Sequence, residues 1–214
     1  MRKTEELPGL YDILFLMHYI EHLSKDKKLS KTLQNGTFDL PKKNKVHLEI
    51  CASIISQQLS TKVAAVIYKR FLDLFSKKIP SPEDILAIPF DELRSIGLSN
   101  SKTNYVRNVC TFFIENKVTD KMIHKMDDEE LIDFLVQIKG VGRWTAEMIL
   151  IFSLGREDVF AVGDLGIQQA MTKLYKLNTE DKKEMKEKML TISKKWKPYR
   201  TYACRHLWAW KDTK

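Results

Sequence analysis

The sequence predicts an all-α protein, and three observations support this fold class. Apolar residues recur at helical spacing along most of the 214 residues. Residues that cap helices precede several of these segments, most clearly in Ser81-Pro82-Glu83-Asp84 and in the pair Asp127 and Glu130. No alternating apolar and polar run is long enough for a strand, and no repeat with a period of about 20–50 residues is present.

The first half of the chain should contain several helices and one clear break. The segment 30–45 interrupts the helical pattern with Asn35-Gly36, Pro41 and a basic cluster, so we expect a loop or a subdomain boundary there. Ser60 can cap the helix that follows it, and Gly97 ends a short one. Helices are expected at 10–23, at 46–58, from Ser60 to Leu74, from Ser81, at 91–96 and at 100–115.

The second half continues the helical pattern around a short glycine turn. An apolar stripe ends at Ile138, and Gly140 and Gly142 then separate it from the next helix. A short extended piece is expected around 160–162. Helices are expected at 127–138, at 144–153, from Leu165, at 179–196 and from Tyr199.

The composition favours a nucleic-acid partner over a membrane. Lys and Arg number 36 against 28 Asp and Glu, and the resulting formal net charge of +8 suits a polyanion. Apolar stretches fall far short of the roughly 20 residues that a membrane helix needs, and the first residues do not resemble a signal peptide. The three cysteines lack a CxxC spacing, so we expect free buried thiols rather than a zinc ribbon or an iron–sulfur cluster. These features favour a soluble protein of the cytoplasm, associated with the nucleoid, or of a nucleus.

The segment from Ile138 to Ala146, with the sequence IKGVGRWTA, is the most informative in the chain. Two glycines allow a tight turn between helices and a close approach of a partner. The helix after the turn would direct free N–H groups and its positive dipole end at an anion, such as a DNA phosphate. The alternative is a tight helical hairpin in which the glycines serve only the turn.

This segment resembles the hairpin of the helix-hairpin-helix DNA glycosylase superfamily, whose pattern is L-P-G-V-G-x-x-T-A. Here Lys139 replaces the usual Pro. Other segments resemble the DNA-3-methyladenine glycosylase II, or alkylbase glycosylase, branch of that superfamily. They are ISQQLS at 55–60, GLSNSK at 97–102, VFAVGDLGIQ at 159–168, WKPYRTYA at 196–203 and HLW at 206–208. The resemblance covers about 46–210.

The resemblance implies two helical lobes with the active-site cleft between them and a helix-hairpin-helix motif for DNA. Residues 47–156 would form an internal bundle that ends in this motif at about 128–153. Residues 1–46 and 157–214 would form a second lobe from both ends of the chain.

The resemblance also implies a monofunctional DNA glycosylase of base excision repair. Such an enzyme flips alkylated purines of the 3-methyladenine and 7-methylguanine type out of double-stranded DNA. It then hydrolyses the N-glycosidic bond and leaves an abasic site. It would be a monomer that needs no cofactor. The alternative is a non-enzymatic helix-hairpin-helix module that only binds DNA.

The catalytic residue implied by the resemblance is Asp164, which stands where the family has its essential aspartate. A carboxylate there would stabilise the oxocarbenium-like transition state and orient the attacking water. The structural alternative is an N-cap for the helix at Leu165, a role that is compatible with catalysis.

Two tryptophans, Trp208 and Trp144, match aromatic residues that would stack on a flipped cationic base, although most buried tryptophans only pack in a core. Trp144 also stands where bifunctional relatives carry a nucleophilic lysine, so β-elimination is not expected. By default we assign Tyr105, Tyr202 and Trp196 to the core.

The remaining implied site residues would contact DNA or a cation. Leu59 would fill the gap left by the flipped base, or would act only as a packing residue at a turn. Backbone N–H groups at the hairpin, with the hydroxyl of Thr145 in support, would bind phosphate at Gly140, Gly142 and Thr145. The hairpin would also hold a structural monovalent cation through the carbonyl oxygens of Val136, Ile138 and Val141.

Overall fold

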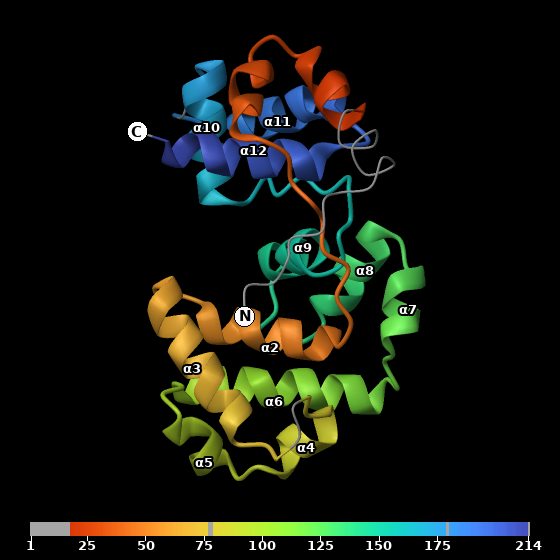
Figure 1. The fold of residues 1–214 in the computed structure, drawn as a ribbon, viewed down its shortest axis with the longest axis vertical. Helices are drawn as coiled ribbons and strands as arrows, with labels where there is room; N and C mark the ends of the chain where they lie inside the picture. The colour runs from red at the N-terminus through yellow and green to blue at the C-terminus, as the bar shows by residue number, and fades with distance from the viewer. Residues whose placement is uncertain (1–17, 77–78, 179, 214) are drawn as a thin grey trace, which may run out of the picture. The chain divides into compact units, whose positions relative to one another are not determined.

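The computed structural model describes residues 18–76, 79–178 and 180–213, and these residues form helices and turns with no strand (Figure 1). The all-α prediction is therefore confirmed. The chain divides into two compact units: an internal unit, Pro41–Gly155, and a terminal unit, Met1–Leu40 together with Arg156–Lys214. None of the described helices is long and apolar enough to span a membrane.

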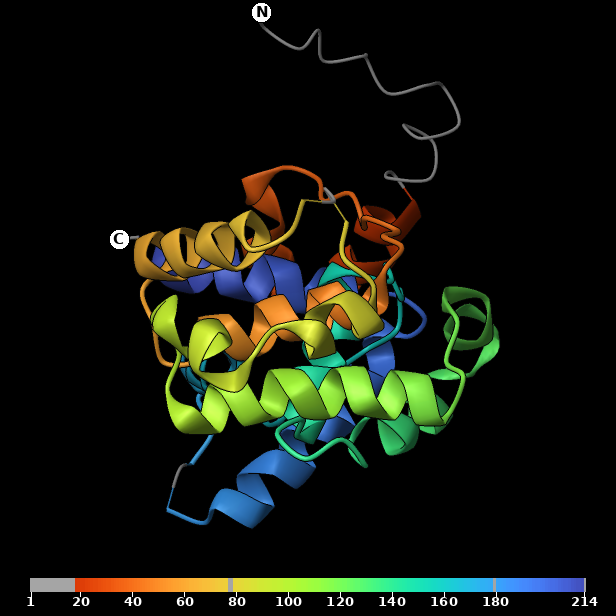
Figure 2. The same cartoon turned by 90° about the horizontal axis from the view of Figure 1, so that it is seen from below.

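The internal unit is built around the long helix α6 (Asn100–Glu115), which lies against α2 (Val46–Ser56) and α4 (Pro82–Ala87). Figure 2 shows α6 as the long green helix of this unit. The unit also contains α3 (Thr61–Asp73), α5 (Phe90–Ser95), α7 (Asp120–Lys125), α8 (Asp128–Leu135) and α9 (Arg143–Phe152). Its core includes the fully buried Ile50, Ile54, Val106, Leu131 and Leu150.

Two helices of the internal unit begin at the capping boxes that the sequence predicts. Ser81 Oγ accepts the Asp84 N–H at 3.2 Å, and Asp84 Oδ2 accepts the Ser81 N–H at 2.9 Å. Asp127 and Glu130 form the same reciprocal pair, with distances of 2.8 and 3.3 Å. Each box satisfies two backbone donors at a helix end, which fixes where α4 and α8 begin.

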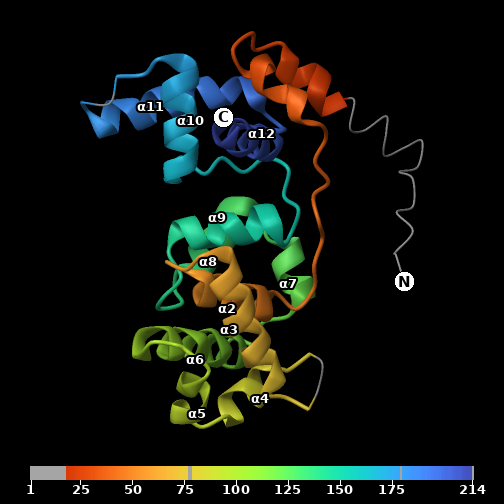
Figure 3. The same ribbon diagram turned by 60° about the vertical axis from the view of Figure 1, so that its left-hand side comes forward.

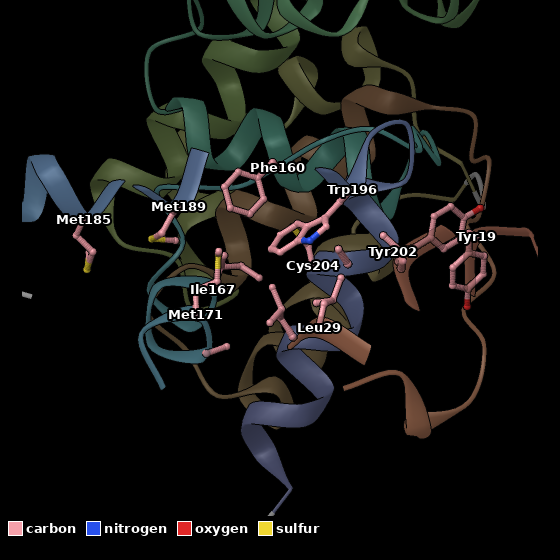
Figure 4. Close-up of a cluster of buried hydrophobic side chains, with 14 residues drawn as sticks. Tyr19, Leu29, Phe160, Ile167, Met171, Met185, Met189, Trp196, Tyr202 and Cys204 are labelled. Atoms are coloured by element: carbon pink, nitrogen blue, oxygen red, sulfur yellow. The ribbon is translucent and has the colours of Figure 1, made fainter. Parts of the chain in front are cut away.

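The terminal unit contains η1 (Leu29–Asn35), α10 (Leu165–Tyr175), α11 (Lys182–Ser193), η2 (Lys194–Trp196) and α12 (Arg200–Asp212). Figure 3 shows α10 standing across α12, which is viewed nearly end-on. In Figure 4, Phe160 meets the ring of Trp196 edge to face, with ring centroids 5.7 Å apart. Tyr202 stacks on Tyr19 at 4.1 Å, so the core assignment of Tyr202 and Trp196 is confirmed.

Several local predictions differ from the structure. The segment 30–45, expected to be a loop or a subdomain boundary, contains the boundary between the two units after Leu40. It begins with a 3₁₀ helix instead of a loop, because Leu29 and Thr32 are both buried on one side of it. The extended piece at 160–162 is a tight turn, in which the Val162 N–H donates to the Phe160 carbonyl at 2.9 Å. A short helix at 120–125 was not predicted. The expected helix at 10–23 is described only from residue 18, and 10–17 lie outside the described residues.

All three cysteines are buried and free, as predicted: Cys51, Cys110 and Cys204.

Acid should destabilise the terminal unit through His206 on α12. The side chain is fully buried against Phe38, with ring centroids 4.8 Å apart, and burial lowers its pKa from 6.5 to about 4. Above pH 6.5 the imidazole is neutral in the folded and unfolded chains, so its effect on the free energy of unfolding is constant. As the pH falls from 6.5 to 4, the unfolded chain takes up the proton before the folded chain does, and the free energy of unfolding falls by about 3 kcal/mol.

Urea unfolding of the wild type and His206→Gln at pH 7 and pH 4 measures this loss. The wild type should lose about 3 kcal/mol more than the variant between the two pH values. The same substitution at the exposed His18 is the control for removal of an imidazole. Equal losses in the wild type and His206→Gln would show that His206 does not titrate below its ordinary range.

Candidate active site and DNA-binding hairpin

Asp164 is the N-cap of α10, and its carboxylate also faces α12. Asp164 Oδ1 accepts the backbone N–H of Ile167 at 2.9 Å and the indole N–H of Trp208 at 2.8 Å. The structure therefore brings together the predicted catalytic carboxylate and one predicted base-stacking residue. Two donors on one oxygen hold the carboxylate in a fixed orientation.

Gly166 leaves room for this contact. A Cβ atom at position 166 would lie 3.0 Å from Trp208 Cδ1 and 3.1 Å from both Trp208 Nε1 and Asp164 Oδ1. These separations are shorter than ordinary van der Waals contacts. Any side chain at position 166 would thus press on both partners of the hydrogen bond. We did not predict a role for Gly166, although it lies two residues after Asp164 in the motif VFAVGDLGIQ.

The segment that leads to Asp164 is fastened to the beginning of α12. Arg200 forms two side-chain bonds with the Asp158 carboxylate, at 2.7 and 2.9 Å, and a third with the Asp158 carbonyl at 2.7 Å. Thr201 Oγ1 donates to the Arg156 carbonyl at 2.6 Å and accepts the Val159 N–H at 3.0 Å. A bidentate Arg–carboxylate pair is both strong and directional. The segment at 196–203, whose function the sequence leaves unassigned, therefore fixes the path of the chain toward Asp164.

The predicted hairpin lies between α8 and α9. Gly140 has φ +109°, a conformation that favours glycine. A Cβ there would also collide with Tyr105, approaching its Cδ1 to 2.6 Å and its Cβ to 2.7 Å. Asn108 Nδ2 supports the same turn by donating to the Lys139 carbonyl at 3.0 Å. Tyr105, assigned to the core by default, is half-buried and packs beneath the hairpin.

Gly142 differs from Gly140, because the fold itself does not require a glycine there. Its φ of −93° suits any residue, and an added Cβ would meet nothing within 4 Å. It is the N-cap of α9 and has no side chain to bond the first N–H groups of that helix. Such a helix start is the type of backbone that binds anions.

The other hairpin residues predicted to bind phosphate or a cation are close together in the sequence and in space. Thr145 is only 3% exposed, and the supporting role of its hydroxyl in a phosphate site stays a prediction. The Ile138 carbonyl accepts the Val141 N–H at 2.9 Å, and Val136 is exposed. Among the described residues, no group of three or more His, Cys, Asp or Glu side chains could hold a metal ion.

An ion-pair network ties the beginnings of α8 and α9 together. Arg143, the first residue of α9, donates to both carboxylate oxygens of Glu129 at 2.8 and 2.9 Å and to the buried Glu147 at 3.2 Å. A positive charge interacts unfavourably with the dipole at a helix N-terminus, and the two carboxylates offset this interaction. Although burial alone would lower the pKa of Arg143, these carboxylates raise it.

Leu59 and Trp144 belong to the internal unit, and both are exposed. Leu59 is 36% exposed in the turn between α2 and α3, and Trp144 is 44% exposed in the first turn of α9. Their proposed contacts with DNA and base stay predictions.

The two hairpin glycines should respond differently to alanine. Gly140→Ala should lower the free energy of unfolding by at least about 2 kcal/mol, because of its φ and the collision with Tyr105. Gly142→Ala should lower the free energy of unfolding by less than about 1 kcal/mol, which is the usual effect of a change at an N-cap. It should nevertheless weaken duplex DNA binding about tenfold, because its methyl group occupies the approach to the N–H groups.

Urea unfolding and fluorescence anisotropy with a labelled duplex measure the two quantities. Unchanged DNA affinity in Gly142→Ala would contradict the proposed anion site at the hairpin.

Residues 51–197 match the family described as the HhH-GPD superfamily base excision DNA repair proteins. The match spans more than half of the chain. The chain belongs to this superfamily.

Relatives within the HhH-GPD superfamily support the alkylbase branch. A putative DNA-3-methyladenine glycosylase of Bacillus subtilis is 30% identical over 199 residues, which cover 90% of this chain and 68% of the relative. DNA-3-methyladenine glycosylase 1 of Schizosaccharomyces pombe is 36% identical over 168 residues, which cover 78% of this chain and 72% of that protein.

Solved structures of the same branch have the same fold. DNA-3-methyladenine glycosidase of Bacillus halodurans superimposes with a TM-score of 0.78 and 34% identity, covering 90% of this chain and 88% of that one. The Schizosaccharomyces pombe 3-methyladenine DNA glycosylase in complex with abasic DNA superimposes with a TM-score of 0.77 and 33% identity, covering 92% and 100%.

Proposed function

We propose that this protein is a monofunctional DNA glycosylase that removes alkylated purines, of the 3-methyladenine and 7-methylguanine type, from double-stranded DNA. The observation that carries the proposal is the Asp164 carboxylate fixed by the Trp208 indole, in a chain that belongs to a base excision repair superfamily. The relatives named DNA-3-methyladenine glycosylases support the choice of substrate. The net charge of +8 suits a DNA partner. Because the proposed substrate is DNA, we also propose that the protein acts where DNA lies, in a cytoplasm with its nucleoid or in a nucleus.

The proposed reaction is hydrolysis at C1′ of the flipped nucleotide. The C1′–N bond breaks and its electron pair leaves with the base, so positive charge develops on the sugar. The Asp164 carboxylate stabilises this charge and accepts a proton from the water whose oxygen bonds to C1′. The products are a free base and an abasic site.

The aromatic residues act on the base in this proposal. Trp208 presents an indole face to the flipped base while its N–H stays on Asp164. Alkylation at N3 or N7 gives a purine a positive charge, and an indole face attracts a cation more than a neutral base. Trp144 is a second proposed base contact. It occupies the position where a Schiff base would need an amine, so strand nicking is not part of the proposal.

The hairpin is the proposed phosphate site. In this proposal the backbone N–H groups at Gly140, Gly142 and Thr145 bind the phosphate, and the α9 dipole favours a negative charge there. A monovalent cation held by the carbonyl oxygens of Val136, Ile138 and Val141 is a further proposal, supported by the short spacing of these residues along the hairpin sequence. Such a cation would add positive charge beside the phosphate.

A base-release assay tests the function against the non-enzymatic alternative. Duplex DNA treated with a methylating agent is incubated with the protein, and free bases are separated by chromatography. The glycosylase releases 3-methyladenine or 7-methylguanine and leaves alkali-sensitive sites. Binding without any release of base would support a DNA-binding module instead.

A further inference from the structure

The turn between α2 and α3 adopts a strained conformation. The Leu59 N–H donates to the Ser56 carbonyl at 3.1 Å, and Gln57 has φ −51° and ψ 132°. Gln58 has φ +58°. These values match a type II β-turn, in which the third residue needs a positive φ and is normally Gly or Asn. A glutamine there costs backbone energy, because its Cβ crowds the neighbouring backbone.

The ammonium group of Lys102, which is partly buried, holds this turn through two hydrogen bonds. Lys102 Nζ donates to the Gln57 carbonyl at 2.6 Å and to the Ile55 carbonyl at 2.8 Å. The backbone of Lys102 is itself fixed, because its N–H donates to Ser99 Oγ at the N-cap of α6. The motif GLSNSK at 97–102 therefore ends in a lysine whose charge is directed at the turn that carries Leu59.

The bond to Gln57 selects between two forms of the turn. Types I and II differ by a flip of the central peptide, which here joins Gln57 and Gln58. In the type I form Gln58 would relax to a negative φ, and the Gln57 carbonyl would turn away from Lys102. Partial burial lowers the pKa of Lys102, and a charge that is partly shielded from water binds carbonyl oxygens more strongly than a fully solvated one.

We infer that Lys102 is a positioning residue that holds the 56–59 turn in its type II form and thereby presents Leu59 to the DNA stack. The inference rests on the proposed function, in which Leu59 fills the space left by the flipped base. Strain at Gln58 is kept because the ammonium group stabilises the form that needs it. Lys102 acts through the turn and not on the substrate.

A double-mutant cycle tests the inference. Lys102→Met, Gln58→Gly and the double variant are compared with the wild type in single-turnover release of 7-methylguanine from a synthetic duplex. Lys102→Met should slow release about tenfold, because flipping from a paired stack depends on the plug. In the Gln58→Gly background, Lys102→Met should slow release by less than about threefold, because glycine adopts the positive φ without the lysine.

Two further measurements separate positioning from other roles. A duplex with an abasic analogue opposite the lesion makes flipping easier, so Lys102→Met should lose less activity on it. Urea unfolding of all variants, with Lys69→Met on the exposed face of α3 as the matched control, accounts for changes in stability.

Three results would overturn the inference. The first is an equal loss of release rate from Lys102→Met with Gln or Gly at position 58, and the second is an equal loss on the two duplexes. The third is a salt dependence of DNA binding whose slope falls by about 1 in Lys102→Met, because such a change marks a lost phosphate contact. Absence of base release by the wild type would refute the proposed function instead.

Discussion

Asp164→Asn should slow the release of alkylated bases by at least about 100-fold while leaving the fold intact. Asparagine keeps the shape of the side chain and an oxygen that can accept the N–H groups of Ile167 and Trp208. It also caps helices as well as aspartate does, so the free energy of unfolding should change by less than about 1 kcal/mol. Only the negative charge opposite the developing cation is lost. Single-turnover release of 7-methylguanine measures the effect.

The terminal unit offers a matched control for this substitution. Asp181 caps α11 through the N–H groups of Lys183 and Glu184, at 2.7 and 3.1 Å. Asp181→Asn makes the same chemical change at a helix N-cap where no tryptophan bonds the carboxylate, and it should keep wild-type release. Near wild-type release by folded Asp164→Asn would leave Asp164 as a helix cap alone.

The fold class and most helix bounds could be predicted because they depend on local signals. Ser81 and Asp127 cap α4 and α8 as predicted, because the residues of a capping box lie within four consecutive positions of the sequence. The 3₁₀ helix at Leu29 was not predicted, because it forms by burial of Leu29 against residues far along the chain. Tertiary packing decides the conformation of such a segment, and the spacing of its apolar residues does not predict it.

The contacts around Asp164 could not be predicted from the sequence, and the roles of the predicted site residues stay predictions. The resemblance placed Asp164 and Trp208 in one site, and the cap role of Asp164 followed from the helix after it. The bond between the two side chains spans 44 positions and could not be inferred from either segment. The contact of Lys102 with the turn that carries Leu59 could not be predicted for the same reason, since it joins residues 45 positions apart and leaves no local sequence pattern.

Gly166→Ala should slow base release about tenfold or more without destabilising the protein. The added Cβ would lie 3.0–3.1 Å from the indole and from Asp164 Oδ1, so it would press apart the hydrogen bond between Trp208 and Asp164. Replacing glycine by alanine restricts the unfolded chain and so adds about 0.4–1 kcal/mol to the free energy of unfolding, which offsets the local strain. Loss of activity without loss of stability is the expected signature of a displaced catalytic carboxylate.

Trp208→Phe should give a similar loss for the same reason, since it keeps an aromatic face but removes the N–H donor. A hydrogen bond to a charged group contributes about 1.5–3 kcal/mol, which corresponds to at least a tenfold change in rate if it is needed in the transition state. The double variant should be no slower than the slower single variant, because both changes act on one bond and the smaller ring leaves space for the methyl group. Gly163→Ala, whose Cβ would meet nothing within 4 Å, is the matched control beside Asp164. Multiplicative losses in the double variant would mean that Gly166 and Trp208 act separately, with Trp208 working through its ring face and not through its bond to the carboxylate.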